Sequence, residues 1–161
     1  MKMNERSGTK ILENVEVGEG TILRDHLNLY GCRIGKNCKI ASFVEIQRGV
    51  TIGNNCKIEP FAFIPVGVTI EDDVFIGPHV CFTNDKYPKA TGDWQVRPTT
   101  VKKGASIGAN STVVCGTTIG ENALIGAGSV VTKDVPRDVL CFGNPAKVRV
   151  RERKSKTDAK E

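Results

Sequence analysis

The chain has 161 residues, a net charge of +5 and only 6% aromatic residues, which favours one domain with a narrow core. Residues 147–161 hold seven basic and three acidic side chains, a surplus of +4, so the body is nearly neutral and broad nucleic-acid binding is not indicated. No stretch approaches the length of a membrane span, and the polar start lacks the apolar run of a signal peptide. We therefore expect a cytoplasmic protein without a membrane partner.

The N-terminal segment, residues 1–10, is predicted to be disordered or loosely attached. From Ile11 a six-residue periodicity begins imperfectly. The positions that keep the step are Val17, Leu23 and Leu29. Ile34 then comes one residue early, which predicts a tightened turn near residues 30–32.

Residues 34–82 carry the clearest pattern, in which every sixth residue is isoleucine or phenylalanine. These residues are Ile34, Ile40, Ile46, Ile52, Ile58, Ile64, Ile70, Ile76 and Phe82. Neither a helix nor simple alternation keeps one phase at a step of six, whereas a parallel β-helix does. Three repeats then close one triangular coil, and successive coils stack ~4.8 Å apart with these side chains inside. The strands of a β-sandwich, the alternative, do not keep phase through so many repeats.

Two of the six cysteines, Cys38 and Cys56, are spaced so that they occupy the same inward position in adjacent coils. That spacing does not forbid a disulfide. Reduced core thiols are nevertheless expected in a chain without a secretion signal. The cysteines show none of the paired spacings of a zinc site, and we expect no metal.

The pattern stops at residues 83–100, a polar and aromatic segment that contains two prolines and the single tryptophan. A long irregular loop within a regular scaffold is a common place for function, the alternative being an insertion without a role. The repeat resumes at Val101, one residue out of phase, and ends after Pro136. Residues 141–150 are predicted to form a turn followed by a short strand or an irregular cap. Residues 151–161 form either a helix or a disordered tail.

The repeats, the loop and the closing run 119–148 together resemble the hexapeptide-repeat acyltransferases, a family with a left-handed β-helix. The resemblance implies an all-β fold, a left-handed parallel β-helix of hexapeptide repeats spanning residues 1–150, with an extruded loop at about 83–100 and a basic tail at 151–161. The handedness comes from the resemblance alone, because parallel crossovers are otherwise mostly right-handed.

Within this family, CFTNDKYPKAT (81–91) and VKKGASIGANSTVVCGTTIG (101–120) look like the small N-acetyltransferases of nucleotide-linked amino sugars, notably the 3-amino type. The resemblance implies an acetyl-coenzyme-A-dependent transfer to the amino group of a UDP- or dTDP-linked sugar, for surface polysaccharide or glycan assembly. It also implies a homotrimer with each active site between two neighbouring β-helices.

The resemblance places Asn84, in the Thr-Asn motif of the loop, beside the reacting amine. Relatives that acylate hydroxyl groups use a loop histidine as general base, and this loop contains none. A hydroxyl group needs such a base to attack a thioester, whereas a neutral amine can attack unaided. Asn84 would then orient the amine. Asp85 is the rival catalytic residue, as a proton acceptor, unless it serves only the turn.

Coenzyme A is expected along the C-terminal coils. By resemblance its contacts are Gly108, Ala109, Gly126, Ala127, Lys133, Asn144, Pro145, Lys147 and Arg149. The cations among them suit its phosphates, whereas the glycines and alanines have an alternative interpretation as turn residues that the fold requires. The candidates for binding the sugar nucleotide are His26, Asn28, Tyr87 and Arg97. Residues 23–28 depart from a Trp-His-containing stretch of several relatives, which leaves the nucleotide and the sugar open.

Two rival functions stay open. The first is an O-acetyltransferase for a sugar or another small hydroxyl acceptor, with His26 of a neighbouring subunit as the base. The second is a solenoid that binds a partner or a sugar without turnover.

Overall fold

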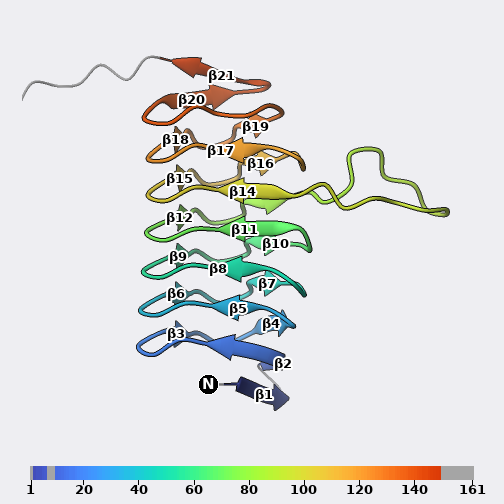
Figure 1. Cartoon of the computed structure of the whole chain (residues 1–161), viewed down its shortest axis with the longest axis vertical. Helices are drawn as coiled ribbons and strands as arrows, with labels where there is room; N and C mark the ends of the chain where they lie inside the picture. Colours follow the sequence, from blue (N-terminus) through green and yellow to red (C-terminus); the bar gives the residue numbers. More distant parts are fainter. Residues whose placement is uncertain (1, 7–9, 150–161) are drawn as a thin grey trace, which may run out of the picture.

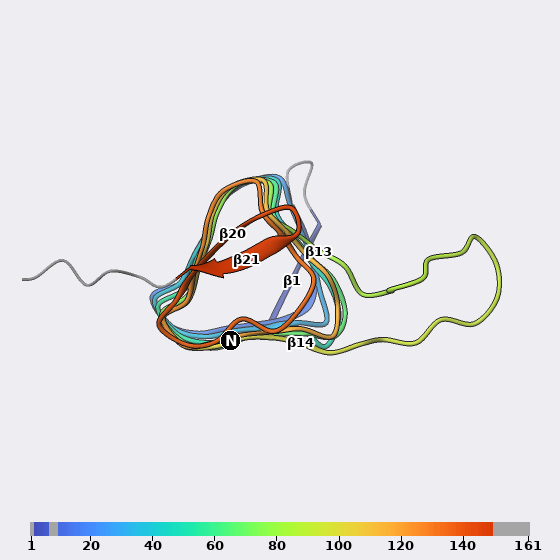
Figure 2. The same ribbon diagram turned by 90° about the horizontal axis from the view of Figure 1, so that it is seen from above.

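The chain folds into a left-handed parallel β-helix with the cross-section of a triangular prism (Figures 1 and 2). A computed structural model describes residues 2–6 and 10–149, which form only strands and turns. Within these described residues there is no helix long and apolar enough to cross a bilayer.

Each face of the prism is a stack of short parallel strands, one from each coil. The first face comprises β2 (Lys10–Val17), β5 (Arg33–Ile34), β8 (Thr51–Ile52), β11 (Val68–Ile70), β14 (Thr99–Val101) and β17 (Thr118–Ile119). The second face comprises β3 (Ile22–Leu23), β6 (Lys39–Ile40), β9 (Lys57–Ile58), β12 (Phe75–Ile76), β15 (Ser106–Ile107), β18 (Leu124–Ile125) and β20 (Leu140–Gly143). The third face comprises β4 (Leu27–Tyr30), β7 (Glu45–Ile46), β10 (Phe63–Ile64), β13 (Cys81–Phe82), β16 (Thr112–Val113) and β19 (Val130–Val131).

The predicted stacking of the aliphatic residues is confirmed. Ile34, Ile52 and Ile70 pair in sequence on the first face, and Val101 follows Ile70. Equivalent columns fill the other two faces, and their inward side chains are almost completely buried. Each buried branched side chain contributes roughly 1.5–3 kcal/mol, so the narrow core stabilises every coil against the next.

The backbone turns at three corners, and each corner carries a column of residues with positive φ. Corner A, between the first and second faces, has Gly20, Asn37, Asn55, Asp73, Gly104, Asn122 and Asp138. Corner B, between the second and third faces, has His26, Phe43, Phe61, His79, Asn110 and Gly128. Corner C, between the third and first faces, has Asn14, Gly31, Gly49, Gly67 and Gly116. Glycine, asparagine and aspartate suit this left-handed conformation, whereas histidine and phenylalanine do not favour it.

The N-terminal prediction was wrong where the structure describes the segment. β1 (Lys2–Arg6) pairs antiparallel with β2, and Met3 packs against the core. The physical reason is the end of the solenoid, where β2 would otherwise present unpaired backbone groups. The tightened turn near residues 30–32 is confirmed, because Gly31 has a φ of 59° and Leu29 still pairs with Ile46.

At the other end β20 and β21 (Ala146–Arg149) form an antiparallel hairpin over the last coil, so the predicted turn and short strand are confirmed. The hairpin turn contains a cis peptide bond between Asn144 and Pro145. The prediction for residues 151–161 lies outside the described residues. In the core, Cys38 and Cys56 occupy adjacent coils as predicted, with free thiols.

Candidate active site

The loop between β13 and β14 leaves the prism at corner C and extends sideways, across the solenoid axis (Figures 1 and 2). Two threonines fix its ends to one turn of the next coil. The Oγ1 atom of Thr83 accepts a hydrogen bond from the backbone N–H of Cys115 (3.0 Å), and Oγ1 of Thr99 accepts one from Gly116 (3.1 Å). The base of the loop is therefore held at one place, although its outer part lies away from the body.

The returning end of the loop packs against two corner C glycines. A Cβ atom on Gly67 would lie 2.4 Å from Cγ1 of Val96, and one on Gly116 would lie 3.5 Å from Cβ of Arg97. Both glycines also have positive φ. The close approach at Gly67 and the backbone conformation of both residues explain why glycine is found here. As a result Arg97 is placed over the same turn that holds Thr83.

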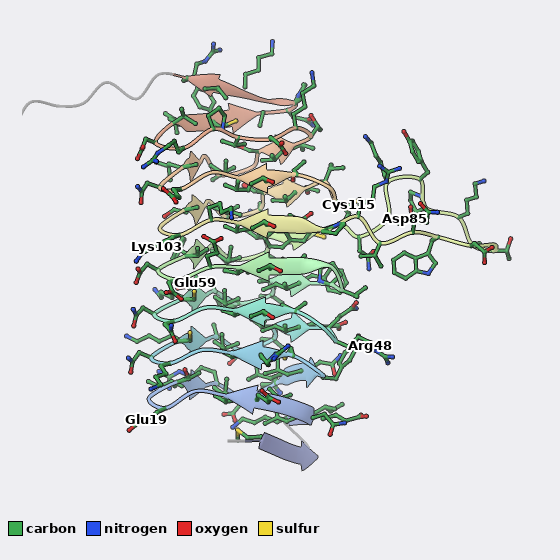
Figure 3. All side chains as sticks on the ribbon, in the orientation of Figure 1. Glu19, Arg48, Glu59, Asp85, Lys103 and Cys115 are labelled. Carbon is green, nitrogen blue, oxygen red and sulfur yellow. The ribbon has the colours of Figure 1, made fainter. Side chains whose placement is uncertain are left out.

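The two predicted catalytic residues follow Thr83 directly, and both are half-buried. Figure 3 shows Asp85 and Cys115 together at the loop base. Oδ1 of Asp85 accepts a hydrogen bond from the backbone N–H of Tyr87 (2.9 Å), so Asp85 does stabilise a turn. Among the described residues no side-chain hydrogen-bond partner of Asn84 is found. The Asn84 amide therefore remains available for a ligand.

Lys133 lies on the same edge as Asn84. The register pairs Phe82 with Val113 and Val113 with Val131, and Asn84 and Lys133 each follow one of these paired residues by two positions. The pairing ends before Asn84, where the loop leaves the prism, so both residues lie at corner C in coils two levels apart.

Most of the other predicted coenzyme A residues gather at the C-terminal end of corner B. Gly108–Ala109, Gly126–Ala127 and the Asn144–Pro145 turn belong to successive levels of this corner. The carbonyl oxygen of Gly126 accepts hydrogen bonds from the hydroxyl groups of Ser111 and Ser129, and Oγ of Ser129 accepts one from the N–H of Gly143 (3.3 Å). These hydroxyl groups tie the hairpin to the coils below it.

The glycines at this end also have a structural explanation. A Cβ atom on Gly108 would lie 2.5 Å from the backbone nitrogen of Ala127, and one on Gly126 would lie 2.8 Å from Cβ of Phe142. Such distances force a neighbour to move, so the fold itself requires glycine there. The predicted cations Lys147 and Arg149 lie exposed on β21, where the guanidinium of Arg149 stands 5.7 Å from the centre of the Phe142 ring.

The predicted sugar-nucleotide residues do not lie together in one chain. Tyr87 and Arg97 belong to the loop, and Tyr87 is 68% exposed. His26 lies at corner B, stacked on Phe43 with ring centres 4.8 Å apart. Asn28 lies on the third face, several coils below the loop base.

Sequence reasoning missed a carboxylate on the third face. Glu45 accepts hydrogen bonds from Nδ2 of Asn28 (3.1 Å), Nε2 of Gln47 (2.9 Å) and the hydroxyl group of Tyr30 (3.5 Å). Burial raises the pKa of the Tyr30 hydroxyl, and the Glu45 carboxylate raises it further. The spacing of 17 residues between Asn28 and Glu45, which equals the shortened first coil, was the signal in the sequence.

The predicted site residues therefore fall into two groups at opposite edges of the third face. Asn84, Asp85, Arg97 and Lys133 lie at corner C, whereas the glycine and alanine pairs and the hairpin turn lie at corner B. Within the described part of the chain, no three histidine, cysteine or acidic side chains are placed to hold a metal ion. In one chain these two groups of residues do not meet.

The prism of stacked six-residue repeats places this chain in the class of parallel β-helix proteins. An extruded loop and a capped end are added to that scaffold. The chain belongs to the family described as bacterial transferase hexapeptide (six repeats), whose model matches residues 31–65, 49–84 and 98–133.

Several known proteins resemble the chain. The dTDP-3-amino-3,6-dideoxy-alpha-D-galactopyranose 3-N-acetyltransferase of Aneurinibacillus thermoaerophilus is 55% identical over 51 residues, which are 32% of this chain and 27% of that protein. The GDP-perosamine N-acetyl transferase of Caulobacter crescentus, solved with CoA and GDP-perosamine, aligns with a TM-score of 0.66 at 25% identity over 76% of this chain and 53% of that one. AntD, an N-acyltransferase from Bacillus cereus solved with dTDP and coenzyme A, shares the fold (TM-score 0.77, 22% identity, 86% and 84% covered). The chain spans less than a third of the length of the first curated relatives that it matches.

Proposed function

We propose that the protein is an acetyl-coenzyme-A-dependent N-acetyltransferase that acylates the amino group of a UDP- or dTDP-linked amino sugar, of the 3-amino type. The observation that carries the proposal is the loop base, where the Asn84 amide follows a threonine fixed to the next coil. The similarity to an acetyltransferase of a dTDP-linked 3-amino sugar, confined to part of the chain, supports the choice of acceptor. The product would serve surface polysaccharide or glycan assembly.

In the proposed reaction the neutral amine attacks the thioester carbonyl and forms a tetrahedral intermediate. The carbon–sulfur bond then breaks, and the proton of the new amide nitrogen passes to the departing thiolate or to water. The Asn84 side-chain oxygen accepts a hydrogen bond from the amine and directs its lone pair toward the carbonyl carbon. Asp85 is the second catalytic residue, as a carboxylate that can receive the proton while one of its oxygens holds the Tyr87 N–H.

Coenzyme A would bind along corner B of the C-terminal coils. The backbone at Gly108–Ala109 and Gly126–Ala127 would border the pantetheine arm, and the Asn144–Pro145 turn would cover the adenosine. The exposed cations Lys147 and Arg149 are suited to the phosphates of this ligand, and Lys133, at corner C, would reach them from a neighbouring copy. No metal takes part in the proposed reaction.

The separation of these two groups of residues favours an assembly of several copies. Corner C, with the amine-orienting residues, and corner B, with the coenzyme A residues, are separated by the third face in one chain. Copies arranged side by side as a homotrimer would bring corner C of one copy next to corner B of another. His26, Asn28, Tyr87 and Arg97 would then contribute to one sugar-nucleotide site, with Glu45 fixing the Asn28 amide.

The test is the release of free thiol from acetyl-coenzyme A with a panel of UDP- and dTDP-linked 3-amino and 4-amino sugars. We expect turnover with a 3-amino sugar, and a loss of about 100-fold in kcat for Asn84→Ala, because a misplaced amine loses much of the proximity advantage. Asn122→Ala, which removes an amide at corner A, is the matched control and should keep full activity.

Full activity in Asn84→Ala would remove that residue from the reaction. Binding of coenzyme A without turnover of any amino sugar would contradict the proposed acceptor and direct the search to hydroxyl acceptors and His26→Asn. A protein that binds no coenzyme A would overturn the proposal in favour of a non-catalytic solenoid.

A further inference from the structure

A hollow of about 330 Å³ opens on the lower part of the second face, and its charged lining is mostly basic. Arg24, Lys39 and Lys57 supply three positive charges, and Glu59 supplies the one carboxylate among the lining residues. The small side chain of Ala41 also lines the hollow and leaves room for a ligand. The hollow therefore has a surplus of two positive charges on a concave surface, which concentrates the field that an anion meets.

The lysines of the hollow are stacked directly on one another. The register pairs Lys39 with Lys57, so their side chains leave adjacent strands at a spacing of ~4.8 Å. Like charges directly opposite each other on neighbouring strands destabilise a sheet. This pair is a local conflict that a bound anion would relieve.

On the first face and at corner A, by contrast, charges stacked across coils are opposite in sign. Nζ of Lys102 lies 2.8 Å from Oε1 of Glu71, and Nζ of Lys103 lies 3.4 Å from Oδ2 of Asp73. Above Lys57 the outward column of the second face continues with uncharged residues, namely Phe75, Ser106, Leu124 and Leu140. The stacked cations are thus a feature of the lower coils and not of the repeat itself.

Two of the three cations are free to bind a ligand. Nζ of Lys57 lies 2.6 Å from Oε1 of Glu59 and 5.7 Å from the centre of the Phe75 ring, so contacts within the protein hold it. Within the described part of the chain, neither Arg24 nor Lys39 has an ion-pair partner, although both line the same hollow. A guanidinium and an ammonium group are the donors that proteins use to bind phosphate.

We propose that this hollow binds the phosphate group of a small organic molecule. A phosphate monoester carries about two negative charges at neutral pH, which matches the surplus of positive charge. Arg24 would donate two parallel hydrogen bonds to it, and Lys39 would donate from the neighbouring coil. Ile22, which is 45% exposed and also lines the hollow, offers an apolar contact to the carbon part of the ligand.

The hollow shares no residue with the candidate sites for coenzyme A and the sugar nucleotide. It lies on the second face, which is directed away from the extruded loop (Figure 2). The inference therefore goes beyond the proposed acetyl transfer and does not require it. Two sources would supply the same chemistry, namely the diphosphate of a sugar nucleotide and a separate phosphorylated metabolite.

The first test is a titration of the isotopically labelled full chain with inorganic pyrophosphate at constant ionic strength, followed through the amide chemical shifts. We expect saturable shifts at residues 39–41 and 57–59. Arg24→Gln/Lys39→Gln should raise the dissociation constant about tenfold or more, because charge-assisted hydrogen bonds are lost. Lys36→Gln/Arg48→Gln removes the same two types of exposed cation outside the hollow, so this matched control should bind as the wild type does.

A steric variant distinguishes a seat in the hollow from diffuse attraction to a basic surface. Ala41→Leu fills the hollow and leaves every charge in place, and it should also raise the dissociation constant about tenfold or more. Thermal unfolding followed by circular dichroism checks that the solenoid of each variant is intact. The inference would be overturned by a wild type without saturable shifts, by an equal loss in the control, or by wild-type affinity in Ala41→Leu.

The second test identifies the source of the phosphate by titrating dTDP and UDP without acetyl-coenzyme A. If the hollow takes the diphosphate of the sugar nucleotide, pyrophosphate will compete with the nucleotide, and Arg24→Gln/Lys39→Gln will weaken the binding of both. If it takes a separate metabolite, the wild type will hold nucleotide and pyrophosphate together, and the variant will lose pyrophosphate alone.

Because no acetyl transfer is measured, a failure of the proposed function does not affect these tests. A chain that binds pyrophosphate in the hollow but neither nucleotide would contradict the proposed acceptor and support the phosphate site. A chain that turns over an amino sugar but shows no binding in the hollow would overturn the inference alone.

Discussion

Corners A and B perform the same turn with different chemistry. At corner A side chains form hydrogen bonds along the axis: Oδ1 of Asn54 accepts one from the backbone N–H of Lys36 (2.8 Å), and Nδ2 of Asn55 donates one to Oδ1 of Asp73 (3.0 Å). At corner B rings stack below and small residues with close backbone approaches follow above. Corner A joins its polar side chains to the neighbouring coils, whereas Phe43 and Phe61 at corner B stay half-exposed. Corner A therefore adds hydrogen bonds to the contacts between coils, and the lower part of corner B adds ring stacking.

The largest effect on the free energy of unfolding is expected at Gly35, the first residue of a corner A turn. Gly35→Ala would place Cβ 2.5 Å from the carbonyl oxygen of Gly53 and should lower the free energy of unfolding by about 3 kcal/mol. Gly49→Ala at corner C meets no atom within 4 Å and suffers only from its positive φ, at about 1 kcal/mol. Denaturant unfolding of both variants measures the difference. Equal losses would show that steric crowding between coils is not what requires Gly35.

A smaller effect is expected at the loop base. Thr83→Val removes the acceptor for the N–H of Cys115 and should lower kcat/KM about tenfold, because Asn84 is then less well positioned. Thr91→Val, in the exposed outer part of the loop, is the control and should have little effect. Kinetics of both variants with the amino sugar that the wild type uses provide the measurement. An unchanged kcat/KM in Thr83→Val would mean that this hydrogen bond does not position the site.

Substitutions at the two corners should differ in their effect on the free energy of unfolding. Asn55→Ala loses the hydrogen bond to Asp73 and a residue suited to positive φ, so it should destabilise the chain by about 1 kcal/mol. Phe61→Asn introduces a residue suited to positive φ, so it should leave the free energy of unfolding nearly unchanged. Thermal unfolding of both variants at one protein concentration compares them. Destabilisation by Phe61→Asn would give the stacked rings of corner B a role in the fold.

The smallest effect is the pH dependence at Glu71 on the first face. The hydrogen bond from Nζ of Lys102 (2.8 Å) holds the pKa of the Glu71 carboxyl below its usual value of 4.5. The stabilisation by the Glu71–Lys102 interaction is therefore present above the usual pKa of the carboxyl group. It is lost as the pH falls through the lower pKa of the folded state. Glu71→Gln should cost roughly 0.3 kcal/mol near neutral pH and progressively less in acid. A loss of stability in Glu71→Gln that grows as the pH falls would contradict this prediction.

The inward columns could be predicted from the sequence because burial imposes a strict period on them. Ile34, Ile52 and Ile70 needed only that period, and so did the adjacent thiols of Cys38 and Cys56. The loop was predictable because proline and glycine interrupt the repeat. Outward-facing residues follow no such period, because almost any polar side chain can be solvated at those positions.

What the sequence left out depends on contacts between coils. The pairing of β1 with β2 reflects an open end of the prism, which no periodicity reports. The carboxylate of Glu45 and the ring of Phe43 acquire their partners from the shortened first coil, so their neighbours were not evident from a uniform repeat. The sequence also did not reveal that the predicted site residues lie at two different corners. These residues are divided by a face of the prism, and their separation along the chain does not report that division.

The two threonines that hold the loop base have one more consequence. Val101 pairs with Ile70 as if no residues intervened, and both ends of the loop are fixed to the same Cys115–Gly116 turn. The excursion can therefore change length or composition without shifting any coil out of register. Under the proposed function the loop would be an exchangeable segment on a constant scaffold, and transplanting a related loop between Thr83 and Thr99 would test whether it sets the choice of acceptor.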